Sequence, residues 1–175
     1  MTSLSDEDRF LPGGYVYMSD FLCRPGVLHQ VCRLFATHYV HDPLDAVMTV
    51  ATKGIPIAQS IADYLNVPFV IARHDSQITE GSTVSVNYVS GSSSRLEKMA
   101  LSKRSLKPGS RVLIVDDFMK GGGTVGGMQS LVKEFDSTVA GVAVFAEGAF
   151  EGERVVPNYT SLLRIHATDD HVDVT

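Results

Sequence analysis

The chain has 175 residues, of which 44% are hydrophobic and 20% are charged, and its formal net charge is −5. This length and composition predict one globular domain with a sizeable core, covering residues 1–175. The negative charge argues against a protein whose whole surface binds nucleic acid, and no apolar run reaches the roughly 18 to 20 residues that cross a bilayer.

The N-terminal part of the chain predicts an irregular or edge element over residues 1–25, followed by a helix at about 26–39. The first residues are acidic and polar, which excludes a secretory signal. Cys23 and Cys32 lack the spacing of a metal or redox motif. We therefore expect two buried or half-buried thiols in a reducing, cytoplasmic compartment.

Four short apolar runs predict buried parallel strands, because they are continuously apolar rather than alternating. They are Ala46–Val50, Pro68–Ala72, Val112–Val115 and Gly141–Ala146. Two segments with apolar residues at helical spacing, Pro56–Leu65 and Thr124–Phe135, lie between strands. This alternation predicts an α/β fold with a doubly wound, mainly parallel sheet.

One segment breaks the pattern, because polar and apolar residues alternate over 83–90 and the flexible turn Gly91–Ser94 follows. This predicts a protruding hairpin, or mobile flap, within residues 75–105. A basic stretch follows the turn, and it can serve phosphate groups, a nucleic-acid backbone or solubility alone. We expect most of its members to be solvated; they are Arg95, Lys98, Lys103, Arg104, Lys107 and Arg111.

The segment Val112–Val125 carries the clearest chemical signal. An apolar strand runs into Asp116 and Asp117, and then Lys120, three glycines and Thr124 lead into a helix. Loop glycines let backbone N–H groups approach a phosphate, and a helix N-terminus adds a favourable field. Two adjacent carboxylates would repel a bare polyphosphate, but they suit the vicinal hydroxyls of a ribose that is held by its 5′-phosphate.

Three other interpretations of this loop compete. A nucleoside triphosphate P-loop needs GxxxxGK followed by Ser or Thr, which is absent from the sequence. A dinucleotide fingerprint fits the spacing of Gly121, Gly123 and Gly126, but its first glycine lies well past the end of the strand. A tight turn without a ligand would not need three consecutive glycines, which cost chain entropy.

The motif VLIVDDFMKGGGTV resembles the binding motif of type I phosphoribosyltransferases for phosphoribosyl pyrophosphate (PRPP). More narrowly, LPGGYVYMSD, MTVATKGIP, TEGSTVSVNYVSGSS and VDDFMKGGGT together resemble the effector domain of the purine operon repressors of Gram-positive bacteria. The resemblance extends from about Phe10 to Leu163. It implies the type I phosphoribosyltransferase fold, with the hairpin as a flap over PRPP and residues 1–25 as a hood or edge element.

The resemblance also implies roles for single residues. It implies that Asp116 and Asp117 contact the ribose hydroxyls. The 5′-phosphate is then bound by Lys120, Gly121, Gly122, Gly123 and Thr124. The pyrophosphate is bound by Ala51, Thr52, Lys53, Gly54 and Arg73. Flap contacts fall to Tyr88, Lys98 and Ser102. The residues of the loop after the first strand also support a pyrophosphate site by themselves, because backbone donors, one cation and a helix N-terminus converge there.

Two functions from different classes remain open at this point. In the first, the chain is the PRPP-sensing domain of a purine biosynthesis repressor; in the second, it is a purine phosphoribosyltransferase. The resemblance favours the sensor and implies a homodimer, Mg²⁺ bound with PRPP, purine nucleotides as competitors, and DNA contact only through a winged-helix domain absent from this chain. We assign no catalytic residue, no metal ligand and no membrane contact. Glu147 ends a strand, where it is either an acceptor for a purine edge or a solvated acid.

Overall fold

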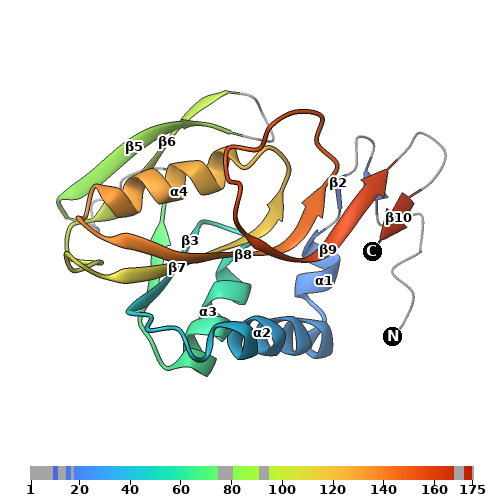
Figure 1. Ribbon diagram of the computed structural model, residues 1–175, viewed down its shortest axis with the longest axis horizontal. Coiled ribbons are helices and arrows are strands. Elements are labelled where there is room, and N and C mark those ends of the chain that lie inside the picture. The colour runs from blue at the N-terminus through green and yellow to red at the C-terminus, as the bar shows by residue number, and fades with distance from the viewer. Residues whose placement is uncertain are drawn as a thin grey trace.

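The computed structural model describes residues 10–11, 15–16, 18–74, 81–90, 95–167 and 172–174. Its centre is a six-stranded sheet in the order β10-β9-β8-β7-β3-β4 (Figure 1). Five strands run parallel, and β10 is antiparallel to its neighbour β9. The strands are β3 (Ala46–Val50), β4 (Phe69–Ala72), β7 (Arg111–Met119), β8 (Thr138–Gly148), β9 (Thr160–Ala167) and β10 (Val172–Val174). The predicted α/β class and the four predicted strands are confirmed.

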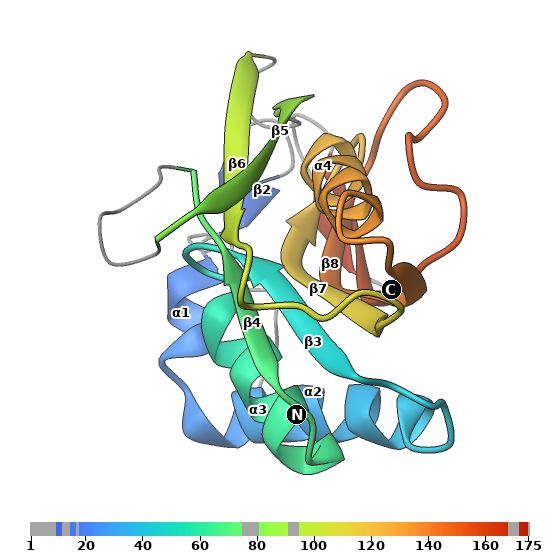
Figure 2. The ribbon, with the colours of Figure 1, turned by 90° about the vertical axis from the view of Figure 1, so that its left-hand side faces the viewer.

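Helices cover both faces of this sheet, which is why its central strands contain continuous apolar runs (Figures 1 and 2). One face carries α1 (Met18–Leu22), α2 (Pro25–Tyr39) and α3 (Ile55–Leu65), and the other carries α4 (Gly123–Lys133). Successive side chains of a strand point to opposite faces. Val47 and Leu113 therefore join the core under α2 and α3, whereas Met48 and Ile114 join the core under α4.

The three longer helices begin and end where the sequence predicts, to within about two residues. Pro25 and Pro56 occupy the first turns of α2 and α3, where a missing N–H costs nothing. Asn66 ends α3 in the left-handed region, with φ of 54°. Both cysteines are free thiols, but only Cys32 is buried as predicted, whereas Cys23 is exposed. Burial raises the pKa of the Cys32 thiol to about 11.

The predicted hairpin is confirmed: β5 (Thr83–Val89) pairs antiparallel with β6 (Leu96–Ser102). It is anchored over α4 on one side of the sheet (Figure 2). Tyr88 and Met99 are buried in the core beneath it, and an added Cβ at Gly127 of α4 would lie 2.8 Å from both side chains. One face of the hairpin is therefore packed against α4, while Val89 and Leu96 near its tip are exposed.

The structure differs from the prediction in four places. The helix α1 lies within residues 1–25, for which an irregular or edge element was predicted. β7 continues through Asp116 and Asp117 to Met119, so both acids lie within a strand rather than in a loop. The last two strands, β9 and β10, were not predicted, because polar residues interrupt the apolar pattern of Thr160–Ala167. Of the proposed hood, the structure describes a short pairing of β1 (Phe10–Leu11) with β2 (Tyr15–Val16), and the rest of 1–17 lies outside the described residues. Among the described helices, none is long and apolar enough to cross a membrane.

Candidate functional site

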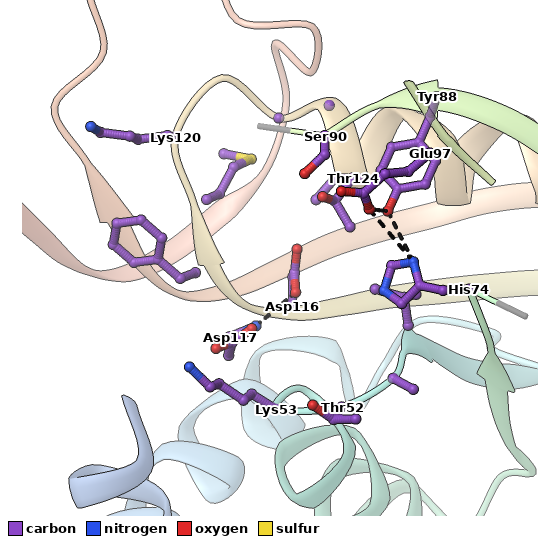
Figure 3. A pocket seen from close by; sticks show the side chains of 17 residues that line it. Thr52, Lys53, His74, Tyr88, Ser90, Glu97, Asp116, Asp117, Lys120 and Thr124 are labelled. Carbon is purple, nitrogen blue, oxygen red and sulfur yellow. Dashed lines mark hydrogen bonds and ion pairs between the residues drawn. The ribbon is translucent and has the colours of Figure 1, made fainter. Parts of the chain in front are cut away.

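A cleft of about 310 Å³ opens at the carboxyl ends of β3 and β7. This is where open α/β sheets bind ligands. Three structures surround the cleft: the loop after β3, the loop between β7 and α4, and the hairpin (Figure 3). The lining residues are Val50, Ala51, Thr52, Lys53, His74, Tyr88, Ser90, Glu97, Asp116, Asp117, Phe118, Met119, Lys120, Gly122, Gly123, Thr124 and Val125.

The two acids of β7 lie in the middle of this cleft. As neighbours in a strand they point apart, Asp116 toward α4 and Asp117 toward Lys53 (Figure 3). The Asp117 N–H donates to Oδ1 of Asp116 over 3.0 Å. Burial, and then the neighbouring carboxyl, raise the pKa of Asp116 well above its ordinary value. Burial also raises the pKa of Asp117, although its interactions with Asp116 and Lys53 oppose the shift.

The loop after β7 leads into α4, and no side chain caps the backbone amides at the start of this helix in the described structure. Gly122 is the N-cap with φ of 83°, a left-handed conformation that favours glycine, and no described side chain caps the helix. Thr124 therefore does not cap α4, and it lines the cleft next to Tyr88. Gly121 does not line the cleft, because it packs under Phe150. The Lys120 side chain borders the cleft but points away from the acids (Figure 3).

The loop after β3 offers a second helix N-terminus on the opposite side of the acids. Ala51, Thr52 and Lys53 line the cleft, and the peptide bond between Ala51 and Thr52 is cis. Gly54 serves instead as the N-cap of α3. An added Cβ at Gly54 would lie 2.3 Å from Oγ1 of Thr49, so this glycine provides close packing rather than a wall of the cleft.

Three other predicted contacts do not line the cleft: Arg73, Lys98 and Ser102. Arg73 exchanges two backbone hydrogen bonds with Ala100, which ties β4 to the hairpin. Lys98 is exposed on β6, and Ser102 is buried at the end of that strand. Tyr88 does line the cleft, as predicted for the flap.

A polar cluster at the mouth of the cleft was not predicted from the sequence. The Tyr88 hydroxyl donates to Oε2 of Glu97 over 2.8 Å and lies 3.3 Å from Nδ1 of His74 (Figure 3). The Tyr88 and His74 rings stack with centroids 6.4 Å apart. Burial, and then Glu97, raise the pKa of Tyr88. Tyr88 and Glu97 are cross-strand partners, so the register of the hairpin was the signal that could have revealed them.

Glu147 fits neither role considered from the sequence. Its side chain is 2% exposed, so it is not a solvated acid. Arg164 Nε donates to Oε1 over 2.9 Å, and Arg154 and the Tyr159 hydroxyl engage Oε2 at 2.7 Å and 2.5 Å. Both carboxylate oxygens are thus occupied within the protein, and no accessible oxygen remains for a purine edge. The partners lie in the loop after β8 and in β9, which the sequence analysis did not assign.

The sequence matches the phosphoribosyl transferase domain family over residues 24–173. It is 58% identical over 166 residues to the purine biosynthesis transcriptional activator PurR of Lactococcus lactis, covering 95% of this chain and 61% of that protein. It is 56% identical over 163 residues to the purine biosynthesis transcriptional repressor PurR of Bacillus subtilis, covering 93% of this chain and 57% of that protein. The chain thus spans about three fifths of the length of these relatives.

A solved structure with the same fold is the adenine phosphoribosyltransferase of Thermoanaerobacter pseudethanolicus. It superposes with a TM-score of 0.70 at 21% identity and covers 77% of this chain and 76% of that one. At this identity the likeness concerns the fold alone. It agrees with the predicted type I phosphoribosyltransferase architecture.

Proposed function

We propose that this chain, which belongs to the phosphoribosyl transferase domain family, is the PRPP-sensing domain of a regulator of purine biosynthesis genes. The observation that carries the proposal is the order of groups along the cleft. The carboxyl pair Asp116 and Asp117 lies between two uncapped helix N-termini, those of α4 and α3. PRPP has a matching order, because its ribose hydroxyls lie between a 5′-phosphate and a pyrophosphate.

Each part of the ligand then meets a group that suits it. The open amides of Gly121, Gly122 and Gly123, with the Thr124 hydroxyl, receive the 5′-phosphate. The two carboxylates accept hydrogen bonds from the ribose hydroxyls, which are strong because the acceptors are charged. Lys53 and the amides of its loop receive the pyrophosphate, and Lys53 also faces Asp117 (Figure 3).

Mg²⁺ enters this proposal with the ligand rather than as a resident ion. The described part of the chain contains no group of three His, Cys, Asp or Glu side chains that could hold a metal. A pyrophosphate carries Mg²⁺ on its own oxygens, and Asp116 and Asp117 can meet the water shell of that ion. The ion would lower the repulsion between these acids and the phosphate groups.

The sensor role is favoured over transfer chemistry by the names of the relatives, which are regulators of transcription. One is called an activator and the other a repressor, so the direction of regulation belongs to the whole protein and not to the cleft. We propose that the whole regulator is a cytoplasmic dimer that contacts DNA. Purine nucleotides then compete with PRPP for the cleft. In the transferase alternative Glu147 was the candidate for a base contact, and its carboxylate is already occupied.

Titration calorimetry with Mg²⁺ and PRPP tests the binding half of this proposal. Wild type should bind saturably, and Gly122→Val should not bind, because valine resists the left-handed φ of 83° that sets the direction of the loop amides. Gly26→Val is the matched control, since an added Cβ at Gly26 meets nothing within 4 Å. Normal binding by a folded Gly122→Val variant would contradict the amide cradle.

The chemical half is tested in the same preparation by pyrophosphate release. With adenine, guanine, hypoxanthine or xanthine, the protein should release no pyrophosphate above background while PRPP still binds. Turnover of about 1 per second with any of these bases, at the low end for enzymes, would establish the transferase instead.

A further inference from the structure

The loop after β8, residues 149–159, lies against the outer side of the loop that precedes α4. Figure 2 shows this segment on one side of α4 and the hairpin, which lines the cleft, on the other. Two glycines mark the close approach: an added Cβ would lie 3.0 Å from the Phe150 ring at Gly121 and 2.9 Å from Val155 at Gly126. This packing explains two of the three glycines that match the spacing of a dinucleotide fingerprint, Gly121 and Gly126.

Two hydrogen bonds join the segment to the backbone of the phosphate loop, Lys120–Gly122. Arg154 Nε donates to the Lys120 carbonyl over 3.0 Å, and the Val155 N–H donates to the Gly121 carbonyl over 3.0 Å. Two successive peptide groups are therefore held from outside the cleft.

Holding these carbonyls fixes the direction of the amides. In a planar trans peptide the C=O and the following N–H point to opposite sides. With the carbonyls of Lys120 and Gly121 directed at the segment, the N–H groups of Gly121 and Gly122 are directed away from it. That is the side on which Lys120 and Gly122 line the cleft. Amides that are oriented before the ligand arrives bind an anion with a smaller ordering cost.

Arg154 can hold the loop only because its own position is fixed. Its guanidinium makes an ion pair with Oε2 of Glu147 at 2.7 Å, donates to the Gly148 carbonyl over 2.9 Å and contacts the Tyr159 hydroxyl. Arg154 is 24% exposed and Glu147 2%, so water competes little for these contacts. Only a planar fork with several N–H groups can reach Glu147, Gly148 and Lys120 at once.

We propose that Glu147 is a positioning residue for the phosphate loop, and that it acts through Arg154, which directs the loop amides into the cleft. Arg164 has a different part. It binds the other oxygen of Glu147, is 58% exposed, and is not among the residues that contact the loop in the described structure. This inference rests on the proposed function, because the anion that the amides serve is the phosphate of PRPP.

The two arginines provide a matched test. Arg154→Ala and Arg164→Ala each remove one positive charge and one partner of Glu147, but only Arg154 holds the loop. Calorimetry with Mg²⁺ and PRPP should show a loss of affinity of about tenfold or more for Arg154→Ala. Arg164→Ala should lose less than about threefold, because an exposed ion pair contributes little. Equal losses in both variants, or normal affinity in Arg154→Ala, would overturn the proposal.

Arg154→Lys separates geometry from charge and also serves if Arg154→Ala does not fold. Lysine keeps the charge but cannot bond Glu147 and the Lys120 carbonyl together, so the affinity should stay low. Full affinity in Arg154→Lys would mean that charge alone matters, which contradicts positioning.

A second readout does not depend on PRPP. In ¹⁵N-labelled wild type, ribose 5-phosphate should shift the amide resonances of Gly121 and Gly122, and in Arg154→Lys these shifts should shrink. If wild type binds no PRPP but shows the shifts, the proposed function fails and the positioning role stands. If neither glycine responds in wild type while PRPP binds, the positioning role fails and the proposed function stands.

Discussion

Asp116 and Glu147 are both buried acids near the carboxyl ends of neighbouring strands, at 6% and 2% exposure, yet their surroundings are opposite. Burial and the adjacent Asp117 raise the pKa of Asp116 well above its ordinary value. At Glu147 burial acts in the same direction, but hydrogen bonds from Tyr159 and Arg164 and the charges of two arginines outweigh it and lower the pKa.

The difference shows that partners, rather than burial, decide what a buried carboxyl does. Glu147 has its charge satisfied within the protein and therefore belongs to the scaffold. Asp116 has no ion-pair partner among the described residues, and it lines a cleft. A carboxyl that costs stability in the free protein is typical of a binding site, where a ligand supplies the missing partners.

The sharpest test of this contrast is the same chemical change at both positions. Glu147→Gln should lower the free energy of unfolding by about 3 kcal/mol, because two arginines lose a buried negative partner. Asp116→Asn should leave that free energy unchanged or raise it, since the amide oxygen can still accept from the Asp117 N–H. Urea denaturation of both variants measures the difference. Equal destabilisation would mean that the two acids have the same structural role.

The next test concerns binding. Asp116→Ala combined with Asp117→Ala should reduce PRPP affinity at least about tenfold, since a hydrogen bond to a charged group contributes about 1.5 to 3 kcal/mol. Calorimetry on the folded double variant measures it. Unchanged affinity would move the ribose away from these acids.

Lys53 tests the opposite side of the cleft with a smaller expected effect. Lys53→Met removes the cation that opposes the raised pKa of Asp117, so this pKa should rise further. PRPP affinity should fall by about threefold to tenfold, because one charged contact to the pyrophosphate is lost. Lys98→Met is the control with the same charge change, since Lys98 does not line the cleft. Equal losses in both variants would indicate a general charge effect.

The smallest expected effect is on the pH dependence of stability. A carboxyl whose pKa is raised on folding binds more protons in the folded state, so stability falls as the pH rises from the ordinary value of 3.8 through the raised pKa. Glu147 acts in the other direction, because its lowered pKa removes stability as the pH falls below 4.5. Replacing both Asp116 and Asp117 by Asn should therefore stabilise the protein more at about pH 7 than at about pH 4. Denaturation curves at the two pH values measure the change; an equal change at both would contradict the raised pKa values.

The sequence by itself determined the four strands β3, β4, β7 and β8, the three longer helices over them and the centre of the cleft. Continuous β-branched runs predict buried strands whatever their partners are, and the residues after two neighbouring parallel strands necessarily meet at one edge. Asp116, Asp117 and the glycines before α4 were found in this way, as was the hairpin from its alternation. Lys53 followed from the family resemblance, which the residues of its loop support. These signals are local in the chain.

Only the tertiary structure decided which polar groups pair. His74, Tyr88 and Glu97 meet because the hairpin folds back over the cleft, and Arg73 is turned to the hairpin by its backbone pairing with Ala100. The sequence predicted that Glu147 is a solvated or base-binding acid, whereas in the structure Arg154, Tyr159 and Arg164 surround its carboxylate. The physical reason is that the pKa and the role of a carboxyl depend on charges within a few ångströms, and here these charges come from a loop and a strand whose sequence carries no strong periodicity.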